Sequence, residues 1–280
     1  MQMRFVQAGG VPTRCLEAGH PDAPALLLVH GLTLTCDLWM RNVDALAQHF
    51  HVIAPDMLGH GFTRPVLAPH EVDVAAKVEH LLSLMDACGH QRFAVSGSSY
   101  GALIAANIYL AAPARVSRLV LNGSGSCFST EAQLVEAVGR AHASYDALMD
   151  ASDPEGWRHH LDTVVHAPAS VPEALPSLLA LAYAQPWIAA YWRATIAAMR
   201  DAAQFQRFRV LERLHEIDVD TLILWGRDDK GARYENAQAA VEKLPRARLI
   251  GIDACGHLPM LEQPAAVNEA MQSFLLQDAR

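Results

Sequence analysis

The 280-residue sequence predicts an α/β fold, in which helices wrap a mostly parallel central sheet and a helical lid is inserted between two halves of that sheet. Strand-like and helix-like segments alternate between residues 25 and 122, as expected for a parallel sheet. Strand signals disappear from residue 123 to about residue 216 and then return. We therefore divide the chain into a first half of the core (1–122), a helical lid (123–216) and a second half of the core (217–280).

The first half of the core contains the clearest strand and helix patterns. Residues 3–8 and 13–18 flank a glycine-containing turn and predict a hairpin. The continuous apolar run at 25–29 is typical of a parallel strand that is buried on both faces. The remaining patterns predict helices at 37–48 and 74–88 and strands at 50–54 and 118–122.

The inserted segment is rich in alanine, aromatic residues and scattered prolines, which predict several short helices broken at the prolines. Trp187 and Tyr191 are four residues apart and would share one helix face. That face either packs on the core or covers an apolar pocket, and in the second case both residues bind substrate. After the insertion, the patterns predict strands at 221–225 and 247–252 and helices at 234–244 and 264–276.

Composition excludes several classes of function. The chain has 30 acidic and 22 basic residues, so we expect no binding to nucleic acid or to an anionic membrane surface. Its apolar stretches are too interrupted for a membrane span, and its N-terminus lacks a signal-peptide pattern. Five cysteines without a Cys-x-x-Cys pair, and His159, His160 and His166 without a ligand spacing, indicate neither disulfides nor a metal site. We expect a cytoplasmic protein with a small-molecule substrate.

The turn Gly97-Ser98-Ser99-Tyr100-Gly101 lies between a predicted strand and a predicted helix. A serine at the centre of such a turn is held above the sheet in a strained conformation, and the residues two positions away must be small. The pattern therefore predicts a nucleophile elbow with Ser99 at its centre.

A serine nucleophile requires a base within hydrogen-bond reach and an acid that orients the base. Asp228 and Asp229 follow the predicted strand that ends at Trp225, and His257 follows the one that ends at Ile252. Because the carboxyl ends of parallel strands meet at one edge, both turns are expected near Ser99. His257 is the candidate base, and either aspartate is a candidate acid.

Together these motifs resemble the lidded α/β-hydrolase family, and the resemblance covers nearly the whole chain. It implies a triad with Ser99 as nucleophile, His257 as base and Asp229, the last residue of Gly-x-x-Asp, as acid. No cofactor is implied.

Two further loops carry the same resemblance. The pair His30-Gly31 is similar to the family's oxyanion loop, which implies backbone N–H donors from Leu32 and Tyr100. The loop at 56–61 resembles a family motif that braces the site.

The resemblance also bears on the substrate. Relatives that cleave carbon–carbon bonds of ring-cleavage products commonly carry Asn and Trp where this chain has Ser98 and Leu258. We therefore expect hydrolysis of a carboxylic ester or lactone of small to medium apolar character, with Leu258 among the substrate-binding residues. Carbon–carbon bond hydrolysis is one alternative, and a ligand-binding receptor on the same fold is another.

Overall fold

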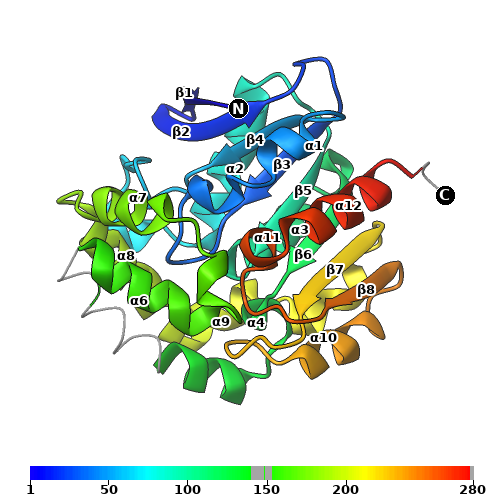
Figure 1. Ribbon diagram of the computed structural model, residues 1–280. Helices are drawn as coiled ribbons and strands as arrows, with labels where there is room; N and C mark the ends of the chain where they lie inside the picture. The colour runs from blue at the N-terminus through cyan, green and yellow to red at the C-terminus, as the bar shows by residue number, and fades with distance from the viewer. Residues whose placement is uncertain (140–147, 149–152, 278–280) are drawn as a thin grey trace.

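An eight-stranded sheet organises the computed structural model, which describes residues 1–139, 148 and 153–277 (Figure 1). The spatial order is β1-β2-β4-β3-β5-β6-β7-β8. The strands are β1 (Gln2–Ala8), β2 (Val11–Ala18), β3 (Ala25–Val29), β4 (His51–Pro55), β5 (Phe93–Ser98), β6 (Val116–Asn122), β7 (Thr221–Gly226) and β8 (Ala247–Ile252). β1 pairs with β2 and β2 with β4 in antiparallel fashion, and all other neighbours are parallel. The predicted α/β class is confirmed.

The first hairpin is confirmed as well. Ala8 pairs with Val11, so Gly9 and Gly10 form a two-residue turn. Both glycines have positive φ, at 56° and 83°. Two residues with φ > 0 are what a tight hairpin turn of this twist requires, and glycine adopts that conformation at no steric cost.

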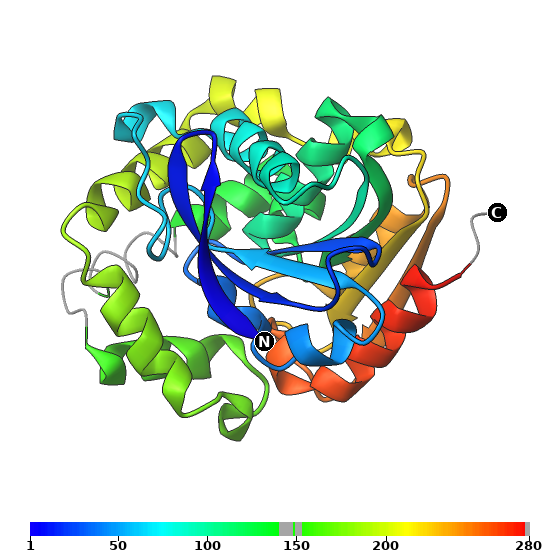
Figure 2. The ribbon, with the colours of Figure 1, turned by 90° about the horizontal axis from the view of Figure 1, so that it is seen from above.

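Helices cover both faces of the sheet, because alternate residues of each buried strand point to opposite sides. In β3, Leu26 and Leu28 pack into one apolar cluster, and Leu27 and Val29 into another. Figure 2 shows α12 on one side of the sheet and α2 on the other. The helices of the core are α1 (Val43–Leu46), α2 (Val74–Ala87), α3 (Tyr100–Ala111), α10 (Tyr234–Val241), α11 (Pro259–Glu262) and α12 (Pro264–Leu275), with 3-10 turns η1 (Cys36–Trp39), η2 (Pro69–Glu71) and η3 (Pro113–Arg115).

The prediction of one continuous helix at 37–48 is wrong. The structure has the turn η1 followed by the separate helix α1. Two buried polar side chains account for the break. Asp37 is held by the guanidinium of Arg14, and Asn42 donates to the side chain of Asn268. These long-range contacts fix the chain in a bend that an unbroken helix could not follow.

Between β6 and β7 the described residues form helices and no strand. The labelled elements are α4 (Gly125–Phe128), α6 (Pro154–Val164), α7 (Ala174–Tyr183), α8 (Ile188–Arg200) and α9 (Ala202–Phe208), with 3-10 turns η4 (Pro168–Ser170) and η5 (Leu211–Glu216). Residues 131–139 are also helical. Prolines begin α6 and η4, a position where the missing N–H costs nothing. Figure 1 shows α6, α7 and α8 grouped together at one end of the sheet.

Among the residues that the structure describes, no helix combines the length and the apolar character needed to cross a membrane.

Candidate active site

Ser99 lies in a sharp turn between β5 and α3, with φ 54° and ψ −117°. A Cβ atom on Gly97 would lie 2.2 Å from the carbonyl oxygen of Gly101, and one on Gly101 would lie 2.3 Å from the carbonyl oxygen of His30. Both approaches are too close for any side chain. The two glycines are therefore required for strand, turn and helix to pack this tightly.

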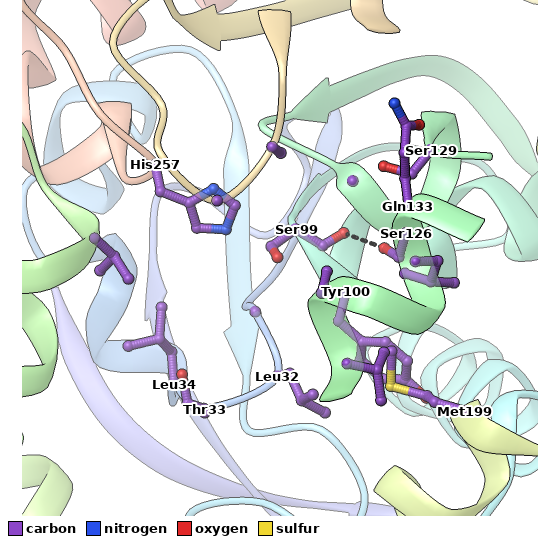
Figure 3. Close-up of a pocket in the computed structure, with 18 of the residues that line it drawn as sticks. Leu32, Thr33, Leu34, Ser99, Tyr100, Ser126, Ser129, Gln133, Met199 and His257 are labelled. Carbon is purple, nitrogen blue, oxygen red and sulfur yellow. Dashed lines mark hydrogen bonds between the residues drawn. The ribbon is translucent and has the colours of Figure 1, made fainter. Parts of the chain in front are cut away.

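Hydrogen bonds on both sides fix the backbone of Ser99. Its N–H donates to the carbonyl oxygen of Asn122 at 2.8 Å. Its own carbonyl oxygen accepts from the hydroxyls of Ser124 at 2.8 Å and Ser126 at 3.2 Å, the second of which is drawn in Figure 3. These contacts leave the side chain of Ser99 directed toward the cavity that it shares with His257.

Asp229 and His257 are brought into contact by the turns after β7 and β8. Oδ2 of Asp229 lies 2.8 Å from Nδ1 of His257. Oδ1 accepts from the backbone N–H groups of Gly231 at 2.8 Å and Ala232 at 2.9 Å, and the side chain is fully buried. Because a carboxylate only accepts, Nδ1 carries the proton, and Nε2 of the neutral ring is the acceptor.

Asp228 is placed differently. Its side chain is 48% exposed, and its carboxylate lies 3.5 Å from Nδ1 of His166. Of the two candidate acids, the structure places Asp229 against His257 and directs Asp228 toward solvent.

Two opposing effects act on the imidazole of His257. Burial lowers its pKa, but the charge and hydrogen bond of Asp229, together with the more distant Glu262, raise it, and the net result is a pKa above the ordinary value of 6.5. Asp229 thus favours the protonated form of the His257 ring.

The turn that carries His257 is anchored by Glu262, a residue that the sequence did not point to. Its carboxylate accepts from the backbone N–H groups of Gly256 at 3.0 Å, Leu258 at 3.1 Å and His166 at 2.7 Å. Because all three partners of Glu262 are backbone N–H groups, no particular residue types are needed at those positions, and the sequence carries no pattern that reveals the contacts. Only the position of this carboxylate, shortly after His257, was a signal.

The loop that begins at His30 approaches Ser99 from the opposite side. Nε2 of His30 accepts from the N–H of Met57 at 2.9 Å, and Nδ1 donates to the carbonyl oxygen of Gly31 at 2.7 Å. Burial lowers the pKa of His30, so the ring stays neutral in this bridge. Leu32 and Tyr100 both line the cavity. Tyr100 is the first residue of α3, and the N–H groups in the first turn of a helix have no acceptor within that helix.

A buried ionic cluster supports the same loop. The guanidinium of Arg14 binds both carboxylate oxygens of Asp37, at 2.7 and 2.9 Å, and approaches Asp56 at 3.4 Å. Asp56 also accepts from the backbone N–H groups of Cys36 and Phe62. The loop at 56–61 is thereby fastened to β2 and η1.

The cavity beside Ser99 has a volume of about 260 Å³. One part of its wall is apolar and comprises Leu32, Leu34, Leu161, Val164, Ile196, Met199 and Leu258. Another part is polar and comprises Ser126, Ser129, Gln133, Glu136, Arg233 and Asn236. Sequence reasoning found Leu258 but none of the polar residues, which come from two distant stretches of the chain, 126–136 and 233–236.

Trp187 and Tyr191 do not line this cavity. Tyr191 packs with Val11, Leu58 and Val72, and its hydroxyl donates to the carbonyl oxygen of Leu67 at 2.6 Å. Trp187 lies against the same cluster, with its ring centroid 5.8 Å from that of Tyr191. The helical spacing did place the two rings on one face, but that face packs on the core, so the expectation that they cover the pocket is not met.

The three histidines singled out in the inserted segment also have separate environments. His160 lines the cavity, with Nε2 3.4 Å from the hydroxyl of Thr33, whereas His166 lies beside Asp228. Burial, followed by the charges of His257 and His159, lowers the pKa of His160 to about 4. Among the described residues no group of three His, Cys, Asp or Glu side chains forms a metal cluster.

Residues 24–264 match the protein family described as alpha/beta hydrolase fold, and the chain belongs to this family. It is 28% identical to the 2-hydroxy-6-oxo-2,4-heptadienoate hydrolase of Pseudomonas putida over 283 residues. This alignment covers 97% of this chain and 95% of that hydrolase. It is also 26% identical over 268 residues to a protein of Agrobacterium fabrum named "Putative carbamate hydrolase RutD", across 91% of this chain and 94% of that one.

A solved structure shows the same fold. The 2-hydroxy-6-oxo-6-phenylhexa-2,4-dienoate hydrolase from Rhodococcus superposes with a TM-score of 0.83 at 22% identity and covers 99% of both chains. The predicted fold family is confirmed, and so is the prediction that the chain is a hydrolase.

Proposed function

We propose that this hydrolase cleaves a carboxylic ester or lactone of small to medium size through an acyl-enzyme on Ser99. The observation that carries the proposal is the 2.8 Å contact between Nδ1 of His257 and the buried Asp229, in a cavity that Ser99 also lines. That contact fixes the tautomer in which Nε2 accepts a proton.

The proposed reaction has two halves. Oγ of Ser99 attacks the acyl carbon while Nε2 of His257 takes its proton, and the backbone N–H groups of Leu32 and Tyr100 stabilise the oxyanion. The protonated His257 then gives its proton to the leaving oxygen. In the second half His257 activates a water, which releases the acid and restores Ser99.

The size of the cavity supports a compact substrate. Ligand pockets usually have volumes of roughly 300–1,000 Å³, and the 260 Å³ found here lies just below that range. Residues from α6 and α8, including Leu161 and Ile196, contribute part of the wall. We infer that the segment 123–216 acts as a lid through these residues. The two halves of the core, 1–122 and 217–280, flank this lid in the sequence.

A second candidate function is hydrolysis of a carbon–carbon bond. The observation that favours it is the 28% identity to a 2-hydroxy-6-oxo-2,4-heptadienoate hydrolase over nearly the full length of both chains. The same nucleophile, base and acid would serve that reaction.

A substrate screen separates the two candidates. Purified protein is assayed with short and medium p-nitrophenyl esters, lactones and dienoate ring-cleavage products, with Ser99→Ala as the control. We expect the highest kcat/KM with an ester or lactone. A kcat/KM for the dienoates that is ten or more times higher than for the esters and lactones would favour carbon–carbon hydrolysis. A factor of ten in kcat/KM equals about 1.4 kcal/mol of transition-state stabilisation. No Ser99-dependent turnover of any probe would favour the ligand-binding alternative.

A further inference from the structure

We propose that the polar part of the cavity wall binds a carboxylate of the substrate, with Arg233 as the residue that selects for it. The proposal rests on the proposed ester or lactone hydrolysis and narrows it to substrates that carry a free acid group. Figure 3 shows Ser126, Ser129 and Gln133 together on the side of Ser99 away from His257.

The hydrogen bonds of this wall leave donors unused and acceptors occupied. Oε1 of Gln133 accepts from the backbone N–H of Thr130 at 2.9 Å, which fixes the orientation of this amide. The same oxygen accepts from Nδ2 of Asn236 at 3.2 Å, and that amide also donates to the hydroxyl oxygen of Ser129 at 3.3 Å. The Ser129 O–H and the Gln133 NH₂ have no acceptor among the described residues.

Arg233 adds a positive charge at the rim of this wall. It is exposed and follows Asp229 in the turn that precedes α10, and its guanidinium forms no ion pair or hydrogen bond with a described residue. Two other arginines of the core are engaged in ion pairs: Arg14 binds Asp37, and Arg227 binds Asp253 at 2.9 Å. Arg233 is therefore available for a ligand.

These groups match the chemistry of a carboxylate. A carboxylate has two acceptor oxygens and no donor, and a guanidinium binds it through two parallel hydrogen bonds. The hydroxyl donor of Ser129 and the amide donor of Gln133 line the same cavity and would add hydrogen bonds to a bound anion. Glu136 also lines this wall and opposes the bound charge, so its removal should improve the binding of an acid.

The test compares two esters of matched shape. Monomethyl esters of dicarboxylic acids, from succinate to adipate, supply the free carboxylate, and their methyl-ketone analogues replace it by a neutral group. The measured quantity is the ratio of kcat/KM for the acid to kcat/KM for the ketone, in wild type and in Arg233→Gln, Arg233→Lys, Glu136→Gln and Lys230→Gln. Lys230 is the control, because it is an exposed cation in the same turn that does not line the cavity.

We expect Arg233→Gln to lower this ratio about tenfold, mainly through KM, because a charge-assisted pair is lost. Arg233→Lys should keep most of the ratio, Glu136→Gln should raise it, and Lys230→Gln should leave it unchanged.

Equal ratios in wild type and Arg233→Gln, or equal losses in Arg233→Gln and Lys230→Gln, would overturn the assignment and leave the proposed ester hydrolysis intact. If Arg233→Gln fails to fold, Glu136→Gln decides: a ratio that does not rise contradicts the proposal. Absence of turnover of both esters by wild type would instead contradict the proposed function itself.

Discussion

The backbone N–H of His257 donates a hydrogen bond to the carbonyl oxygen of Val164 at 2.9 Å. Val164 ends helix α6, where carbonyl groups have no partner within the helix. Gly256 permits this approach, because a Cβ atom there would lie 2.6 Å from the backbone nitrogen of His166. The turn of the proposed base and the end of α6 in the inserted segment are therefore joined by a backbone hydrogen bond.

Ser99→Ala should lower kcat by about three to six orders of magnitude, because the base and the oxyanion donors are left without a nucleophile. The fold should persist, as checked by an unchanged Tm. Ser98→Ala is the matched control, since the Ser98 hydroxyl lies in the same turn and is buried without a hydrogen-bond partner among the described residues. Near-normal turnover by Ser99→Ala would remove Ser99 from the mechanism.

Asp229→Asn should lower kcat by about 10²- to 10⁴-fold, because the amide disturbs the tautomer of His257 and removes the charge that stabilises its protonated form. Asp228→Asn should have a much smaller effect, as its side chain is half exposed and lies beside His166. Steady-state kinetics of both variants check the ranking. A larger loss in Asp228→Asn would move the acid to that position.

The pH profile of kcat/KM should have its acidic limb above pH 6.5, since Asp229 raises the pKa of His257 and only the neutral ring accepts a proton. Activity is thus lost as the pH falls through this raised value. In Asp229→Asn the raising charge is gone while burial remains, so the limb should move to lower pH. A limb at the same pH in both proteins would mean that another group titrates.

Glu262→Ala should reduce both stability and turnover. Three backbone N–H groups lose their acceptor, and for those of the buried residues Gly256 and Leu258 an unsatisfied donor costs about 1–3 kcal/mol. The misplaced base should lower kcat by about 10- to 100-fold. Glu269→Ala, an exposed glutamate on α12, is the control for charge. If Glu262→Ala had lower stability but normal kcat, the carboxylate would support the fold without positioning His257.

Tyr191→Ala should lower the free energy of unfolding by about 3 kcal/mol or more, because the ring is buried in the cluster with Leu58 and Val72. Its preference among acyl chain lengths should be that of wild type. Met199→Ala is the contrasting variant, since Met199 lines the cavity, and it should change that preference by about 10-fold or more. Thermal melts and kcat/KM values for two esters of different length check both statements.

The sequence was most informative where structure is set by neighbouring residues. Gly97 and Gly101 predicted the elbow, because the strain at Ser99 is local and only glycine fits there. The turns after β7 and β8 predicted that Asp229 and His257 lie near each other, since parallel strands end at one edge.

Contacts between distant residues were beyond the reach of such patterns. The break between η1 and α1 depends on Arg14, which is 23 residues from Asp37. Helical spacing placed Trp187 and Tyr191 on one face but carried no information about the surface opposite that face. The unused donors of Ser129 and Gln133 depend on Asn236, a residue of α10 that is more than 100 positions away in the sequence.

The contact between Arg14 and Asp37 gives the N-terminal hairpin a structural role in the site. β1 and β2 occupy the edge of the sheet, far from Ser99 in the chain, and a truncation series would treat them as dispensable. Deleting them removes the guanidinium and leaves Asp37 and Asp56 as two buried carboxylates without a cation. Shortened or chimeric versions of this enzyme therefore have to retain β2, or supply a positive charge at the same place, to keep the loop of Leu32 in register with Ser99.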